Sequence, residues 1–143
     1  MVFEPSAPPT DRAGFLAWYD KQTRWAEARD YNEPAGTTDS LRDWFMDMIK
    51  QFPALNGSFA GNDYDNHKTT DYCIGSVVIY AAFAWSELQN AYRATFEMVH
   101  KHRVGFFDVS ANDGQVWMPD GGTGYRIVHG KGCSLDWPGK SPL

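Results

Sequence analysis

The sequence predicts an α+β fold, in which about three helices pack on one side of a mixed or antiparallel sheet of three to five strands, in a single domain. Residues 38–52 and 86–103 repeat apolar side chains at helical spacing. Residues 72–83 are rich in β-branched and aromatic side chains, as buried strands are. Residues 104–118 place an Asn-Asp-Gly turn between two short apolar runs, which indicates a β-hairpin. A chain of 143 residues fits one domain with one core.

The N-terminal part is expected to contain a strand and a helix. Residues 2–4 can form a short first strand, which ends at the prolines that follow. Thr10 or Asp11 is expected to cap a helix that runs to about Arg29, although Gly14 weakens its first turn. Residues 31–37 contain Pro and Gly and are expected to form a loop.

The second helix has the clearest periodicity in the chain. Thr38 or Asp39 is expected to cap it, and Pro53 ends it. One face carries the apolar residues Leu41, Trp44, Phe45, Met48, Ile49 and Phe52. The segment that follows, residues 54–70, is the longest irregular stretch, so it is a candidate functional loop.

The central part is expected to form strand, helix and hairpin. Residues 72–83 form either one interrupted strand or a hairpin of two short ones, and their near-continuous apolarity predicts cover on both faces. Ser86 is expected to cap the third helix, whose inner stripe includes Tyr92, Thr95 and Phe96. The strands of the hairpin are expected at 104–109 and 115–118.

The chain changes character after Pro119. Residues 1–119 form the predicted α+β domain, and residues 120–143 are expected to be a Gly/Pro-rich C-terminal tail with a short extended piece at 125–129. Cys73 and Cys133 do not make a disulfide framework, and their pairing and redox state stay open.

Charge and composition restrict the partners of the protein. The formal net charge is −5, and residues 1–71 hold twelve Asp/Glu against seven Lys/Arg, so the excess lies in the first half. No Lys/Arg cluster suited to phosphates occurs, so nucleic acid is not an expected partner. Because there is neither a signal peptide nor an apolar run of membrane-spanning length, we expect a cytoplasmic protein that does not bind membranes.

Reactive side chains form no pattern that indicates catalysis. Gly121, Gly122 and Gly124 do not fit a nucleotide-binding motif. Asp63, Asp65 and His67 offer metal ligands in a loop, but their spacing does not match a calcium loop. We therefore predict no enzyme activity, no cofactor and no metal. The alternative is a small metal- or ligand-binding, enzyme-like domain that uses residues 56–71.

Several short segments carry a family resemblance. They are 15–19 (FLAWY), 41–45 (LRDWF), 79–86 (IYAAFAWS) and 104–110 (VGFFDVS). In these segments the chain resembles a family of small, uncharacterised bacterial proteins, and the resemblance covers about residues 2–119. These look like immunity proteins of type VI secretion or polymorphic toxin systems. The resemblance implies a protein that binds a cognate toxin in the cytoplasm and neutralises it by occluding its active site.

The acidic half suggests where such a toxin would bind. A toxin with a basic active-site cleft would be attracted to acidic side chains. Trp117 is added because Trp is enriched in binding hot spots, although a core position is the other interpretation of this residue. The predicted contact residues are Asp30, Glu33, Asp39, Asp43, Asp47, Asp63, Asp65 and Trp117. A self-associating structural domain is a further alternative, and monomer and homodimer stay open.

Overall fold

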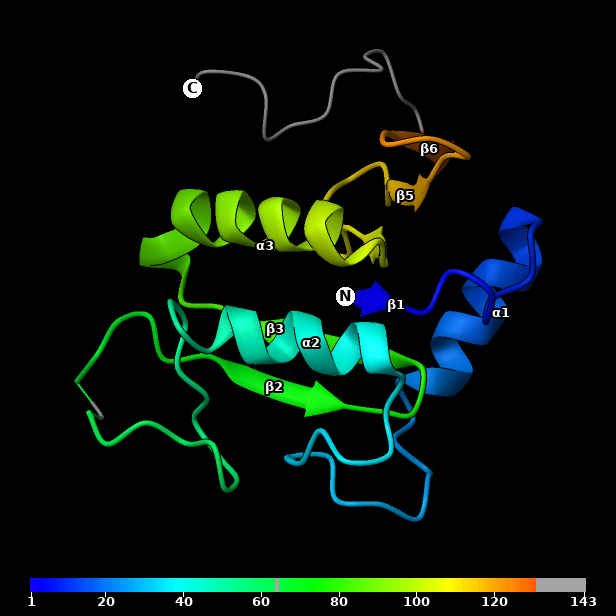
Figure 1. Cartoon of the computed structure of the whole chain (residues 1–143). Coiled ribbons are helices and arrows are strands. Elements are labelled where there is room, and N and C mark those ends of the chain that lie inside the picture. The colour runs from blue at the N-terminus through cyan, green and yellow to red at the C-terminus, as the bar shows by residue number, and fades with distance from the viewer. Residues whose placement is uncertain (64, 131–143) are drawn as a thin grey trace.

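The computed structural model describes residues 1–63 and 65–130 and has an α+β architecture (Figure 1). Six strands form one open sheet in the order β2-β3-β1-β4-β5-β6, and all neighbouring strands are antiparallel. The predicted α+β class is confirmed, with one strand more than the expected maximum of five. In chain order the elements are β1 (Val2–Phe3), α1 (Arg12–Gln22), α2 (Asp39–Met48), β2 (Asp71–Ile74), β3 (Val78–Ala82), η1 (Trp85–Glu87), α3 (Leu88–His102), β4 (Gly105–Phe107), β5 (Val116–Pro119) and β6 (Tyr125–His129).

The helices cover both faces of the sheet, whereas the sequence led us to expect them on one side. Val2, Ile79 and Phe106 belong to the large core cluster under α2 and α3. Their chain neighbours Phe3 and Val78 pack with Phe15 of α1 in a second cluster. The difference arises because successive strand side chains point to opposite faces, so fully apolar strands require cover on both.

The first two helices are shorter than their patterns predicted. Asp11 caps α1 by accepting a hydrogen bond from the Gly14 amide at 2.7 Å. The chain leaves the helix soon after Gln22, and Trp25 takes a left-handed conformation with φ of 51° that a right-handed helix cannot contain. Thr38 caps α2, as expected, but the helix ends at Met48 rather than at Phe52.

The third helix begins differently from the prediction. Ser86 does not cap it. Instead, the short turn η1 leads into α3, and neither element has a side-chain cap. The predicted inner stripe is confirmed for Thr95 and Phe96, which are buried together with Ala91 and Val99, whereas Tyr92 is only partly buried.

The order of the strands brings the ends of two distant segments together. β3 and β4 both pair with β1 in antiparallel orientation, so they run parallel to each other with β1 between them. α3 connects them, and their carboxyl ends therefore lie at the same edge of the sheet. Gly105 permits this close pairing, because a side chain there would overlap the ring of Phe3.

The segment after Pro119 continues the sheet. The extended piece expected at 125–129 is β6, which pairs with β5. Asp120 closes the turn between them by accepting hydrogen bonds from the amides of Gly122 and Gly124. The remainder of the predicted tail, residues 131–143 with Cys133, lies outside the described residues.

Candidate functional site

A cleft opens at the carboxyl ends of β3 and β4, beside the start of α3. Its volume is about 280 Å³. The cleft is lined by Met1, Tyr80, Ala81, Ala82, Phe83, Trp85, Leu88, Ala91, Tyr92, Thr95, Phe106, Phe107, Asp108, Val109 and Ser110.

Met1 separates the two strand ends at the base of the cleft. Its amino group donates a hydrogen bond to the Phe107 carbonyl at 3.0 Å, and its carbonyl accepts one from the Phe107 amide at 2.8 Å. Burial lowers the pKa of the Met1 amino group to about 5, and the charge of Asp108 opposes this effect only in part. Met1 thus extends the pairing of β1 with β4 by one residue.

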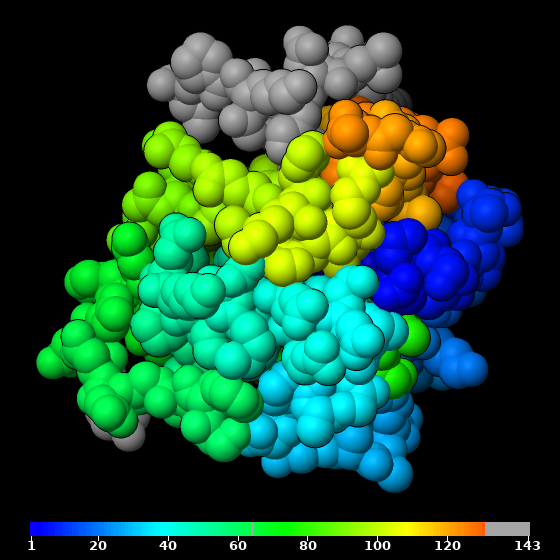
Figure 2. Space-filling view, in the orientation of Figure 1, coloured from blue at the N-terminus to red at the C-terminus, as the bar shows by residue number. Residues whose placement is uncertain are grey.

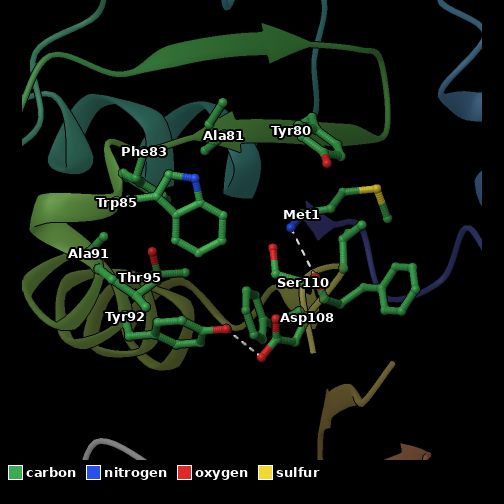
Figure 3. Close-up of a pocket in the computed structure, with 15 residues that line it drawn as sticks. Met1, Tyr80, Ala81, Phe83, Trp85, Ala91, Tyr92, Thr95, Asp108 and Ser110 are labelled. Carbon is green, nitrogen blue, oxygen red and sulfur yellow. Dashed lines mark hydrogen bonds between the residues drawn. The ribbon is translucent and has the colours of Figure 1, made fainter. Parts of the chain in front are cut away.

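A hydrogen bond between α3 and the end of β4 provides the strongest polar contact of the cleft. The Tyr92 hydroxyl donates to an Asp108 carboxylate oxygen at 2.6 Å (Figure 3). Burial raises the pKa of Tyr92, and the bond to Asp108 raises it further, so the phenol remains protonated at neutral pH. The Asp108 amide donates to the Gln115 carbonyl at 2.9 Å, which fixes the residue on the β4–β5 hairpin.

The cleft also holds a buried hydroxyl. Thr95 lies one helical turn after Tyr92 on the same face of α3, and its side chain lines the cleft. It is 5% exposed, and its hydroxyl has no hydrogen-bond partner among the described residues. A buried polar group without a partner costs free energy, so this hydroxyl, whose oxygen has almost no accessible surface, is expected to reduce the stability of the fold.

Trp85 forms the rim of the cleft. It is 79% exposed, and Leu88, one turn later, is 40% exposed. Figure 3 shows the indole on one side of the cleft and Tyr92 and Asp108 on the other. The sequence analysis assigned Trp85 no function. The sequence did contain one indication of this surface. Trp85 lies three residues before Leu88, so it continues the apolar stripe of α3 beyond the end of the sheet.

Trp117 does not form an exposed anchor. It is 3% exposed and packs in the core against Phe96 of α3, with ring centroids 6.3 Å apart. Its cross-strand partner is Phe106 of β4. The interface interpretation of Trp117 is therefore wrong for the isolated chain, because β6 pairs outside β5 and α3 covers its face.

Three of the predicted acidic contact residues lie on α2 and are engaged by cations. Asp39 and Asp43 both pair with Arg42, at 3.1 and 3.4 Å. Asp47 accepts hydrogen bonds from Lys50 and Lys101 at 2.8 Å and from His102 at 2.7 Å. These bonds, with the one from Lys101 contributing most, hold the pKa of Asp47 well below its usual range. Asp47 thus joins α2 to the end of α3, where the two helices meet on the face shown in Figure 2.

The other four acidic residues lie in loops. Asp30 accepts a hydrogen bond from the Asn32 amide at 2.9 Å. Glu33 accepts two from Ser58, at 2.6 and 2.8 Å, and so connects the two long loops. Asp63 and Asp65 are exposed, and the Asp65 amide donates a hydrogen bond to the Asp63 carboxylate at 3.2 Å. None of the eight predicted contact residues lines the cleft.

The loop at 56–71 is anchored rather than separate from the core. Thr70 is buried, its amide donates to the Pro53 carbonyl at 2.8 Å, and its carbonyl accepts from the Leu55 amide at 2.9 Å. Asp63, Asp65 and His67 are not among the residues that line the cleft with Asp108. In residues 1–63 and 65–130, no group of three His, Cys, Asp or Glu side chains is placed to hold a metal ion.

Cys73 lies on β2, half-buried and with a free thiol. Burial, with a smaller contribution from Asp71, raises the pKa of this thiol to about 11. The thiol is therefore protonated at neutral pH and lacks the thiolate that a nucleophile requires. A bridge to Cys133 lies outside the described part of the chain.

Comparisons with known proteins assign neither a family nor a function to the chain. Neither a model of a protein family, nor a curated protein, nor a solved structure matches the chain. Within the described residues, no helix is both long and apolar enough to cross a membrane. The class of the protein is thus defined by its fold alone, an α+β domain with a six-stranded antiparallel sheet.

Proposed function

We propose that this protein is an immunity protein, which binds a cognate bacterial toxin in the cytoplasm and neutralises it by occluding the toxin's active site. The observation that carries the proposal is Trp85, which is 79% exposed at the mouth of a cleft. An exposed Trp beside a concave surface is typical of protein-binding hot spots. The kind of partner follows from the resemblance of the sequence to immunity proteins.

The position of Trp85 supports a protein as the partner. Trp85 and the neighbouring Leu88 lie at the start of α3, whose inner face is fixed in the core by Phe96 and Val99. An aromatic side chain has few rotatable bonds and therefore loses little conformational entropy on binding. The cleft behind it, at about 280 Å³, is at the lower limit of the roughly 300–1,000 Å³ of small-molecule sites. It is better suited to a side chain of a partner protein.

The proposal is tested with the product of the gene that lies next to the one encoding this protein. Expression of that product alone should arrest growth, and coexpression of this protein should restore it. Trp85→Ala should weaken the purified complex at least about thirtyfold, because hot-spot truncations cost about 2 kcal/mol or more. Leu16→Ala is a matched control, since Leu16 is an exposed apolar residue of α1 on the other face of the sheet.

Two outcomes would overturn this function. One is a neighbouring gene product that neither arrests growth nor binds. The other is a Trp85→Ala variant that protects and binds like the wild type. A protein that forms dimers, which dissociate when Trp85 is replaced, would instead show that a second copy of this chain covers the rim.

A further inference from the structure

We propose that the cleft receives an arginine side chain of the partner protein, with its guanidinium between the Trp85 indole and the Asp108 carboxylate. This inference rests on the proposed function in one respect, because it takes the bound molecule to be a protein. It specifies which side chain of the partner enters the cleft and which residues bind it, and neither the fold nor the resemblance gives this information.

The first argument is the charge of Asp108. Among residues 1–63 and 65–130, its carboxylate accepts a hydrogen bond from Tyr92 and forms no salt bridge with Lys or Arg, and the nearby Met1 amino group has a pKa lowered by burial to about 5. It lies half-buried among the apolar and aromatic residues of the cleft. A carboxylate in such surroundings interacts strongly with an entering cation, because the low local dielectric strengthens the attraction.

The second argument is the set of acceptors. Tyr92 donates its proton to Asp108, so its oxygen keeps lone pairs for another donor. The Thr95 hydroxyl, buried on the same face of α3, has no hydrogen-bond partner among the described residues. Asp108 and Tyr92 thus offer two acceptor groups on one side of the cleft, whereas the Thr95 hydroxyl oxygen has almost no accessible surface. A guanidinium supplies five N–H donors in a fixed plane and can satisfy several acceptors at once.

The third argument is the aromatic rim. The indole of Trp85 lies across the cleft from Tyr92 and Asp108 (Figure 3). Guanidinium groups stack on aromatic faces, and Trp gives the strongest cation–π attraction of the aromatic residues. The apolar lining from Ala81 and Ala91 suits the aliphatic stem of an arginine. The net charge of −5 also favours a basic partner surface over an acidic one.

The test uses blocked amino acids, so it does not depend on finding the toxin. N-acetyl-arginine N-methylamide is titrated into the full-length protein, and the indole N–H of Trp85 is followed by NMR. The citrulline derivative is the matched probe, because it has the same shape without the charge. We expect saturable shifts with arginine and binding at least about tenfold weaker with citrulline, as the loss of a charge-assisted hydrogen bond predicts.

Variants show whether the named residues form the contact. Asp108→Asn should remove the preference for arginine over citrulline. Asp113→Asn should keep it, because Asp113 lies in the adjacent β4–β5 turn and does not line the cleft. Thr95→Val should keep the preference for arginine and leave the protein at least as stable as the wild type, because it removes a buried hydroxyl without a partner. A merely structural role for Asp108 would not change the ratio of the two affinities.

The outcomes separate this inference from the proposed function. Equal binding of arginine and citrulline, tighter binding of the lysine derivative, or no binding of any of them would overturn the inference, even if Trp85 is required for a toxin complex. Arginine binding that depends on Asp108 would support it, even if the neighbouring gene product is not the partner.

Discussion

Asp47 and Asp108 both contact α3, but at opposite ends of the helix and with opposite electrostatic partners. Asp47 of α2 accepts hydrogen bonds from three cationic or ionisable side chains, two of them at the end of α3. Asp108 contacts the first half of α3 through the neutral hydroxyl of Tyr92. The chain surrounds the first carboxylate with cationic side chains, whereas the second faces a neutral phenol and the buried Met1 amino group, whose pKa is lowered by burial. Acidic residues therefore have to be judged by their partners, since the total charge does not distinguish a structural contact from a binding site.

The largest effect on stability is expected at Asp47. Asp47→Asn removes the charge that Lys50, Lys101 and His102 share, at a side chain that is only 15% exposed. Because hydrogen bonds between charged groups contribute about 1.5–3 kcal/mol, we expect the free energy of unfolding to fall by about 2–3 kcal/mol. Urea denaturation followed by circular dichroism measures this change.

Asp43→Asn is the control for that experiment. Asp43 lies one turn earlier on α2, is exposed and pairs with Arg42 alone among the described residues. Exposed ion pairs contribute little, so its stability should stay within about 0.5 kcal/mol of the wild type. Equal losses in the two variants would contradict the distinction between a structural and a surface carboxylate.

The pH dependence of stability is the next largest effect. Hydrogen bonds from Lys101, Lys50 and His102 hold the pKa of Asp47 below its ordinary value of 3.8. The unfolded chain therefore binds a proton at a higher pH than the folded one, and the contribution of Asp47 is complete above the ordinary pKa and lost as the pH falls below it. The slope is at most about 1.4 kcal/mol per pH unit for one group.

Denaturation curves between about pH 5 and pH 2 test this sign. The stability of the wild type should fall more steeply with decreasing pH than that of Asp47→Asn. Parallel curves for the two proteins would show that other carboxylates account for the acid sensitivity.

A smaller effect on stability is expected at Asp108. Asp108→Asn keeps an oxygen that can accept from Tyr92, and no salt bridge is lost among the described residues. The free energy of unfolding should change by no more than about 1 kcal/mol, the value of a single neutral hydrogen bond. Urea denaturation under the conditions used for Asp47→Asn checks this. A loss as large as at Asp47 would make Asp108 a structural residue and would weaken the case for the cleft.

Periodicity was sufficient to predict most of the fold. The apolar face of α2 and the inner stripe of α3 depend on local spacing, and the hairpin after Phe107 depends on a turn sequence. Cover on both faces of residues 72–83 was predicted, but the helix that covers the second face was not identified, because α1 buries only Phe15 completely and its pattern did not show which face it would meet. The left-handed residue Trp25 likewise has no local signal, because its ring is held by distant contacts with Tyr31 and Tyr80.

The cleft could not be predicted in the same way. It is built from the exits of β3 and β4, which are about 25 residues apart in sequence and are brought together by the insertion of β1 between them. Only the strand order shows that Asp108 and Trp85 lie on the same cleft. The sequence correctly shows that the first half of the chain is acidic. The role of each carboxylate, however, depends on which cationic side chains pack against it in the folded protein, as at Asp47.

The smallest effect is expected at Asp63 and Asp65, two exposed loop residues of the contact surface that the sequence predicted in the acidic first half. The double variant Asp63→Asn, Asp65→Asn removes two exposed carboxylates. The two residues are connected by a hydrogen bond from the main-chain amide of Asp65 to the carboxylate of Asp63. If the partner binds at the Trp85 rim, its dissociation rate should be unchanged, and its association rate should fall only slightly at low salt, because distant charges act through steering. Surface plasmon resonance at two ionic strengths separates the two rates. A large increase in the dissociation rate would move the contact surface from the cleft to this loop, since a residue that acts only by steering does not hold the complex together.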